Sequence, residues 1–428
     1  MMSPIKFASA ADHPFLFGIP LEFILFGLTL LGIAVFHRRT LLVALIGLGT
    51  IALYKILFTG FGHGPGVIGF ILHVGDEWVA LANLFGLLTG FALLSRHFEK
   101  SHLPVVLPRC MPHDWKGGFL LLVMVFVLSS FLDNIAGALV GGAMAHQIFR
   151  AKVHPGYLVA LVAAANAGGA WSVIGDTTTT MMWISGISPL VLLKAIVPAA
   201  IALVIFGIPA AKWQHGYSPI LRHSHAHTKI DWGRIAIVGL ILALVVGTNI
   251  IVETIFPREA SRFPFLGVAL WAALFVSLFV RRPDWEVLPE AFGGSIFLLA
   301  LVLCASMIPV QNLPAPTWQT AFGLGFVSAV FDNIPLTALA LKQGGYDWGF
   351  LAFTIGFGGS MIWFGSSAGV ALTNLFPEAR SVCQWLRHAR FVILAYVIGF
   401  FAMLWLSPWQ PEPVEKRSPI KVLSEDRR

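Results

Sequence analysis

Residues 119–145 read FLLLVMVFVLSSFLDNIAGALVGGAMA, an apolar run with an acid and an amide, Asp133-Asn134, near its middle. A second apolar run, FGLGFVSAVFDNIPLTALALK at 322–342, carries the same pair as Asp332-Asn333. A carboxylate at membrane depth costs about 2.5–3.5 kcal/mol on insertion scales. The chain places such a carboxylate in each half, in similar local sequence. This pattern predicts a duplicated membrane architecture with a polar centre, as in many secondary transporters.

The composition predicts an integral membrane protein. Of the 428 residues, 57% are hydrophobic and 11% are charged, whereas a soluble domain carries about 25% charged residues. Apolar stretches repeatedly reach about 18–22 residues, which is enough to span a bilayer. The net charge of +7 is scattered over short loops, which argues against nucleic-acid binding. Cys110, Cys304 and Cys383 have no metal-ligand spacing, and we expect no cofactor.

Apolar segments follow one another in the same order in the two halves of the chain. The first half, 1–210, gives plain spans at about 15–36, 41–59 and 78–95, a broken run at 117–148, an interrupted span at 156–184 and a plain span at 188–210. The second half, 234–410, repeats this order at about 234–253, 264–281, 292–310, 318–341, 347–374 and 390–408. We interpret 211–233 as a cytoplasmic linker and 411–428 as a polar C-terminal tail. Each broken run is interpreted as a re-entrant hairpin.

Basic residues gather on one side of this topology. The loops that hold Arg38-Arg39, Arg96 to Lys116, Arg150 and Lys152, Lys212 to Arg234, Arg281-Arg282, and Arg380 to Arg390 all fall there. Opposite loops such as ISGISPL at 184–190 have no charge, and the positive-inside rule assigns the basic side to the cytoplasm. The basic C-terminal tail is the exception, because it falls on the other side.

Each half then crosses the membrane five times, and an odd number of crossings inverts one half relative to the other. We therefore predict an all-α integral membrane protein. It consists of two inverted repeats of about five spans each, and each repeat has a re-entrant hairpin and an interrupted helix.

The hairpin tips offer oxygen ligands for a small cation. Asp133 and Asp332 supply carboxylates, Asn134 and Asn333 supply amide oxygens, and broken helix ends supply free carbonyls. Such hard ligands suit Na⁺, Li⁺ or H⁺ rather than soft metals. Helix capping is the alternative, because Asp and Asn are preferred N-cap residues. Both roles can hold together.

The interrupted spans add a second set of small and polar residues. The candidate ligands are Asp176 and Thr177 in the first span and Ser366 and Ser367 in the second. The supporting residues are Asn166, Gly168, Gly169, Ser172, Gly175, Gly358, Gly359 and Gly365. Glycine lets backbone approach a ligand closely. Tight packing of small residues between membrane helices is the alternative, but packing does not require the charge at Asp176.

Two further features carry weaker signals. His73 and Glu77 lie at i, i+4 near a span entrance, where they could form a pH-responsive pair or a plain interfacial pair. The loop segment HSHAH, with His223, His225 and His227, could bind metal or sense pH, with a solvated loop as the alternative.

Four segments, FLDNIAGALVGG, VAAANAGGAWSVIGDTTTTMMW, FDNIPLTALAL and GFGGSMIWFGSSAGVAL, resemble the ion transporter superfamily. The resemblance is closest to NhaD-type Na⁺/H⁺ antiporters, with citrate-transporter-like and arsenite-permease-like relatives. It runs from about residue 70 to 405 and implies two inverted repeats around a central ion site. The ion-site residues that it implies are Asp133, Asn134, Asp176, Thr177, Asp332, Asn333, Ser366 and Ser367. Dicarboxylate carriers of this superfamily have Ser-Asn-Thr at the hairpin tips, and the Asp in this chain disfavours a carboxylate substrate.

We expect a secondary transporter that exchanges Na⁺ (or Li⁺) for H⁺ by alternating access, with Na⁺ held at Asp133 and Asp332. A carboxylic acid that is removed from water beside another carboxylate releases its proton at higher pH, which permits exchange near neutral pH. The main alternative is Na⁺- or H⁺-coupled transport of an organic anion such as citrate or another dicarboxylate. An intramembrane enzyme with an aspartate dyad is a further alternative, but hydrolysis does not require duplicated breaks.

We expect a multi-pass protein of the cytoplasmic (inner) membrane of a bacterium. Its expected partners are small inorganic cations and the lipid bilayer, without nucleic acid, and a homodimer is compatible with the sequence.

Overall fold

The computed structural model describes residues 15–16, 19–36, 39–106, 111–220, 229–260 and 262–412. A short antiparallel pair, β1 (Phe15–Leu16) and β2 (Ile19–Pro20), precedes the first helix. The first half then contains α1 (Leu21–Val35), α2 (Thr40–Tyr54), the π-helix η1 (Lys55–Thr59), α3 (Gly66–Glu99), α4 (Leu103–Val106), α5 (Trp115–Ser129), α6 (Asn134–Ile148), α7 (Pro155–Gly169), α8 (Thr177–Ile184), α9 (Pro189–Leu192), the 3-10 helix η3 (Leu193–Ala195) and α10 (Ile196–Tyr217).

The second half is likewise built from helices. It contains α11 (Trp232–Ile255), α12 (Pro257–Ala260), α13 (Phe265–Ser277), η4 (Trp285–Val287), α14 (Leu288–Ser306), η5 (Val310–Asn312), α15 (Trp318–Ser328), α16 (Asn333–Gln343), α17 (Trp348–Gly358), α18 (Ser367–Leu375), η6 (Pro377–Arg380) and α19 (Val382–Leu406).

Several of these helices can cross a membrane. In the part of the chain that the structure describes, six helical segments are long and apolar enough: Thr40–Thr59, Gly66–Glu99, Pro189–Tyr217, Trp232–Val252, Trp285–Ser306 and Val382–Leu406. Shorter apolar helices lie at Leu21–Ile33, Trp115–Ser129, Phe265–Ser277 and Trp348–Gly358. The all-α membrane class is confirmed.

Both predicted break points in the hairpin sequences are helix boundaries. Residues 130–133 join α5 to α6, and residues 329–332 join α15 to α16. Asp133 and Asp332 occupy the N-cap positions of α6 and α16. The interrupted spans are also broken where the glycine-rich segments predict, between α7 and α8 and between α17 and α18.

Glycine is required where each interrupted helix meets its hairpin. A Cβ at Gly168 would overlap the carbonyl oxygen of Phe126 on α5, and a Cβ at Gly358 would overlap that of Gly325 on α15. The missing side chains let α7 lie directly against α5 and α17 against α15. This contact holds each break beside a hairpin tip.

Two helices begin earlier than the sequence predicts. α3 begins at Gly66 rather than near 78, because the bundle accommodates polar residues such as His73, whose Nε2 is 2.9 Å from Ser306 Oγ. α19 begins at Val382 rather than near 390, and its Arg390 stacks on the Trp213 ring.

The predicted linker, 211–233, is shorter in the structure because α10 extends into it. α10 continues through Tyr217 because the Gln214 side chain donates to the carbonyl oxygens of Lys152 (3.0 Å) and Ser218 (3.1 Å) inside the protein. Most of the predicted tail 411–428 lies outside the described residues.

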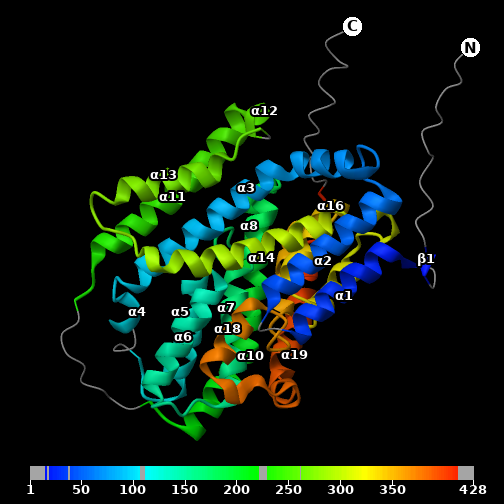
Figure 1. The fold of residues 1–428 in the computed structure, drawn as a ribbon. Coiled ribbons are helices and arrows are strands. Elements are labelled where there is room, and N and C mark those ends of the chain that lie inside the picture. Colours follow the sequence, from blue (N-terminus) through cyan, green and yellow to red (C-terminus); the bar gives the residue numbers. More distant parts are fainter. Residues whose placement is uncertain are drawn as a thin grey trace, which may run out of the picture.

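The helices form two groups. In the framework group, α1 packs against α2, α2 against α14, α14 against α3, α3 against α13, and α13 against α11. In the core group, α5, α7 and α19 all pack against α10, and the hairpins and broken helices complete the group. Figure 1 shows α11, α13 and α3 across the upper part of the view and α5, α6, α7 and α10 below them.

Candidate functional site

Asp176 is the buried carboxylate of the first interrupted helix, and only 1% of the residue is exposed. It is the N-cap of α8, where Asp is preferred because its side chain accepts from the unpaired amides of the first helical turn. Asp176 Oδ1 accepts from the Thr178 amide at 3.3 Å, and Oδ2 accepts from Thr178 Oγ1 at 2.6 Å. Capping thus fixes the position of this carboxylate.

Both hairpin tips reach Asp176. Asn134 Nδ2, on the first residue of α6, donates to Asp176 Oδ1 at 3.3 Å. Asn333 Nδ2, on the first residue of α16, lies 3.4 Å from Oδ1 and 3.3 Å from Oδ2. One buried carboxylate therefore contacts the tips of two hairpins that are far apart in the sequence.

Asn166 joins the two interrupted helices. The residue is fully buried on α7, and its Oδ1 accepts from Asn134 Nδ2 at 3.2 Å. Its Nδ2 donates to Ser360 Oγ and Ser366 Oγ, each at 3.0 Å, in the second break. Asn166 is thus a hydrogen-bonding link between the halves, a more specific position than the supporting role predicted for it.

Asp133 and Asp332 are both half-buried N-caps, but their hydrogen bonds differ. Asp332 Oδ1 accepts from the Ile334 amide at 3.1 Å, and Oδ2 accepts from Ser367 Oγ at 3.2 Å. Asp133 has no side-chain cap hydrogen bond to α6. The capping interpretation therefore holds for the Asp332 side chain, while the Asp133 side chain forms no such cap bond.

The other predicted residues surround this centre or support it. Thr177 is the buried first residue of α8, and Ser366 caps α18 by accepting from the Gly369 amide at 3.3 Å. Ser172 Oγ donates to the Ser130 carbonyl at 2.5 Å, so it ties the first break to the first hairpin tip. Gly169 faces Gly175, and Gly359 faces Gly365, with too little room for a Cβ at either contact.

The sequence points to Thr177 but not to its neighbour Thr178. Thr178 supplies the hydroxyl on the Asp176 carboxylate. Thr177 to Thr180 are four consecutive threonines, so residue type alone does not separate them. The capping rule could have found Thr178, because an N-cap carboxylate accepts from the residue two positions later. Ser360, which contacts Asn166, has no comparable sequence signal.

The three carboxylates have no basic partner among the residues that the structure describes. In the described part of the chain, neither Asp133, Asp176 nor Asp332 forms an ion pair with Lys or Arg. Among the same described residues, no group of three or more His, Cys, Asp or Glu side chains could hold a metal ion. A cation at this centre would therefore need amide, hydroxyl and carbonyl oxygens in addition to carboxylates.

The predicted histidine features lie apart from the centre. His73 contacts Ser306 and the Phe61 ring, whose centroid is 5.6 Å away. A pH-sensing role for His73 and Glu77 stays a prediction. His223, His225 and His227 lie outside the described residues.

No protein-family model matches the chain. It is 30% identical over 307 residues to sodium/proton antiporter 2 of Arabidopsis thaliana, covering 61% of this chain and 69% of that protein. It is 29% identical over 328 residues to sodium/proton antiporter 1 of the same plant, covering 68% of this chain but only 55% of the relative's length. It is also 27% identical over 307 residues to the Na⁺/H⁺ antiporter NhaD of Vibrio parahaemolyticus, covering 60% of this chain and 72% of that protein. The chain therefore belongs to the NhaD-type sodium/proton antiporters of the ion transporter superfamily.

Proposed function

We propose that this protein exchanges Na⁺ (or Li⁺) for H⁺ across a membrane. The observation that carries the proposal is the buried Asp176 carboxylate, which accepts hydrogen bonds from Asn134 and Asn333 on opposite hairpins. Asp133 and Asp332 precede these two asparagines and add two more carboxylates, which have no basic partner in the described part of the chain. Such an excess of acid needs a cation or a proton for neutralisation.

Competition between the two ions explains the exchange. Na⁺ and H⁺ neutralise the same carboxylate charge, so the site holds one or the other. Oxygen ligands for Na⁺ are available from Asp133, Asp332, Thr177 and Ser367, and oxygen ligands suit small hard cations. Alternate occupation then couples Na⁺ movement in one direction to H⁺ movement in the other.

The helix N-termini argue against an organic anion as the substrate. Such an ion would use their free amides. Asp176 already occupies the start of α8, Asp332 the start of α16 and Ser366 the start of α18. We therefore favour a cation over citrate or another dicarboxylate.

The two halves are proposed to be inverted repeats. Matching contacts support this: Ser129 Oγ donates to the Ala165 carbonyl at 2.7 Å, and Ser328 Oγ donates to the Ile355 carbonyl at 2.8 Å. In the framework, α3 corresponds to α14 and α2 corresponds to α13. α3 packs on α13 and α14 packs on α2, as expected if a two-fold axis relates the halves. We assign the basic side to the cytoplasm of a bacterial inner membrane. Alternating access would move the core group against the framework.

Everted membrane vesicles provide the test. Addition of Na⁺ should release a preformed proton gradient with the wild-type protein but not with Asp133→Asn or Asp332→Asn at equal expression. Asp114→Asn is the matched control, since Asp114 caps α5 on the basic side and lies outside the site. Exchange retained in both site variants would contradict the proposal. Na⁺ uptake that requires citrate would instead favour symport.

A further inference from the structure

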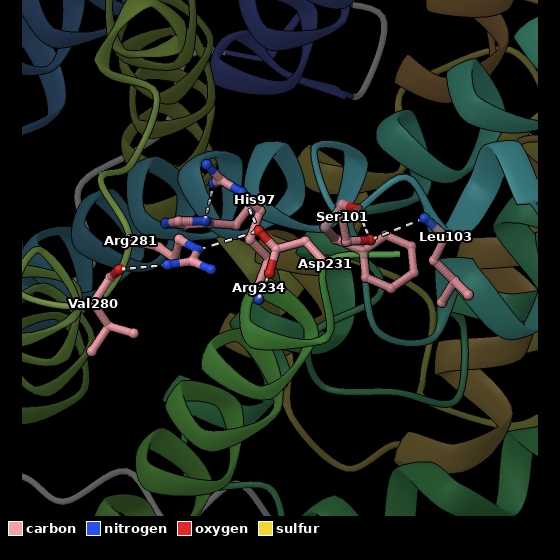
Figure 2. Close-up of polar contacts among 8 residues, drawn as sticks. His97, Ser101, Leu103, Asp231, Arg234, Val280 and Arg281 are labelled. Carbon is pink, nitrogen blue, oxygen red and sulfur yellow. Dashed lines mark hydrogen bonds and ion pairs between the residues drawn. The ribbon is translucent and has the colours of Figure 1, made fainter. Parts of the chain in front are cut away.

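The basic side carries two clusters of cations that differ in their carboxylates. The first, the paired cluster, joins the end of α3 to the start of α11 and to the segment between α13 and η4. Its members are Arg96, Glu99, Lys100, Asp231, Arg234, Arg281 and Asp284. Figure 2 shows Arg234 and Arg281 beside Asp231, with His97 accepting from Arg234.

Every cation of the paired cluster has a carboxylate within reach. Asp231 Oδ2 lies 3.2 Å from Arg281 Nε and 3.6 Å from Arg234 Nε. Asp284 Oδ2 lies 2.6 Å from Lys100 Nζ and 3.2 Å from Arg96 Nε. Hydrogen bonds from Lys100 and Arg96 lower the pKa of the Asp284 carboxyl, so this acid stays ionised. The paired cluster leaves little charge for a ligand.

The second cluster, the open cluster, lies where α10 ends and α19 begins. Its cations are the exposed side chains of Arg150, Lys152, Lys212, Arg387 and Arg390. Within the described residues, none of these five forms an ion pair. The loop 149–154 belongs to the same place, because Gln214 on α10 bonds the Lys152 carbonyl at 3.0 Å and the His154 amide at 2.7 Å.

Two cations of the open cluster contact aromatic rings in place of carboxylates. The Arg390 guanidinium lies 5.5 Å from the Trp213 ring and 5.2 Å from the Phe391 ring, and Lys212 Nζ lies 5.3 Å from the Trp115 ring. Such contacts orient a cation without neutralising it. Trp213 is itself fixed by Gly156, where a Cβ would meet its ring at 2.7 Å.

An exposed apolar stripe continues from this cluster along α19. Leu394 (45% exposed), Ile398 (41%), Phe401 (43%) and Trp405 (84%) follow Arg390 at intervals of three or four residues, so they share one helix face. A cation at the basic end of such a stripe is aligned with the headgroup and chains of a phospholipid.

We propose that the open cluster binds the phosphate of an anionic glycerophospholipid whose acyl chains lie along this face of α19. The unneutralised charge at Arg387 and Arg390 selects a lipid with net negative charge, because a zwitterionic headgroup brings its own cation. The exposed stripe selects a lipid over free phosphate, which has no chain to bury. The inference does not depend on which ion the protein transports.

Thermal unfolding of the purified full chain in detergent tests the assignment. Phosphatidylglycerol, phosphatidylcholine and inorganic phosphate are titrated in separate experiments, and the half-saturating concentration of each is measured from the rise in midpoint temperature. The test variant is Arg387→Gln/Arg390→Gln. The charge-matched control is Lys100→Gln/Arg281→Gln in the paired cluster, and Arg390→Lys keeps the charge.

Phosphatidylglycerol should stabilise the wild type, while phosphatidylcholine and phosphate should not. The test variant should need roughly 25-fold more phosphatidylglycerol, since each cation near an anionic lipid contributes a factor of about five. The control pair and Arg390→Lys should stay within about fivefold of the wild type. Equal losses in the test and control variants, an unchanged test variant, or stabilisation by phosphate alone would overturn the proposal. If the test variant does not fold, binding of Arg390→Lys beyond about fivefold of the wild type would also overturn it.

Discussion

The second arms of the two hairpins differ in what covers them. No side chain of α16 is exposed, and this helix packs against α14 of the framework and against α8. α6 packs against α5, α7, α18 and the short helix α4, and it exposes Leu139, Ala143, His146 and Gln147. Equivalent parts of the two halves are therefore in different environments.

Lys342 holds α16, the buried second arm of its hairpin, against the end of α14. Lys342 Nζ, in the last turn of α16, donates to the Ser306 carbonyl at 2.5 Å and to the Ile308 carbonyl. The last carbonyls of a helix have no intrahelical partners and carry partial negative charge, which suits an ammonium group. If the halves are inverted repeats, the structure is closed on the side opposite the basic side. Exchange of the environments of α6 and α16 would then give the state that is closed on the basic side.

The largest effect should come from the residue that breaks the symmetry of the site. Asp176→Asn removes the carboxylate that both hairpins contact and should reduce Na⁺-driven proton flux at least about 100-fold, in the range of essential charged groups. Its counterpart Ser366→Ala removes one cap bond and one bond from Asn166, and the loss should stay below about tenfold. Flux is measured in proteoliposomes at equal protein content. Similar losses in both variants would show that the site treats the halves alike.

Cysteine accessibility compares the two arms directly. Leu139 and Ala338 are the sixth residues of α6 and α16 and are 37% and 8% exposed. In a background without Cys110, Cys304 and Cys383, Leu139→Cys should react with a soluble maleimide at least about tenfold faster than Ala338→Cys. The difference follows from burial, because a reagent reaches a buried side chain only through local opening. Equal rates would contradict the assignment of the open side.

The contact of Lys342 with the end of α14 should control how fast the native Cys304 is labelled. Cys304 is fully buried near the end of α14 that Lys342 contacts. With Cys110 and Cys383 replaced by serine, Lys342→Met should raise the labelling rate of Cys304 about fivefold. A charge-assisted hydrogen bond contributes about 1.5–3 kcal/mol, and new contacts of α16 in the variant should offset part of that loss. Lys342→Arg keeps the charge and should label like the parent. No change in Lys342→Met would remove the fastening role.

The smallest effect is expected where the halves agree. Ser129 and Ser328 make hydroxyl bonds of 2.7 and 2.8 Å to the neighbouring broken helix. Ser129→Ala and Ser328→Ala should each lower the free energy of unfolding by about 1 kcal/mol. Thermal unfolding in detergent measures both. A clear difference between the two would show that one hairpin depends more than the other on its broken helix.

Local signals account for what the sequence predicted correctly. An Asp-Asn pair in an apolar run and a glycine pair before a polar segment are strong enough to locate the hairpin tips and the breaks. Helix ends were harder, because residues such as His73 and Arg390 look like loop residues until their partners Ser306 and Trp213 are known.

The contacts across the centre could not be predicted. Asn166 bonds Ser360 and Ser366 across 194 and 200 residues, and no local pattern encodes such a pairing. The contact of Lys342 with α14 could not be predicted for the same reason. The carbonyls that it binds are 36 and 34 residues away, and backbone carbonyls leave no mark in the sequence.

We propose that Asp176 and the two hairpin aspartates bind a cation in competition with protons. The most direct test is proton flux in proteoliposomes that hold wild-type protein or Asp176→Asn, on addition of Na⁺, Li⁺, K⁺ or citrate in turn. We predict proton movement with Na⁺ or Li⁺ alone, no response to K⁺ or citrate, and no response of Asp176→Asn to any of the four. Flux that requires citrate, or Na⁺-driven flux that survives in Asp176→Asn, would contradict the account.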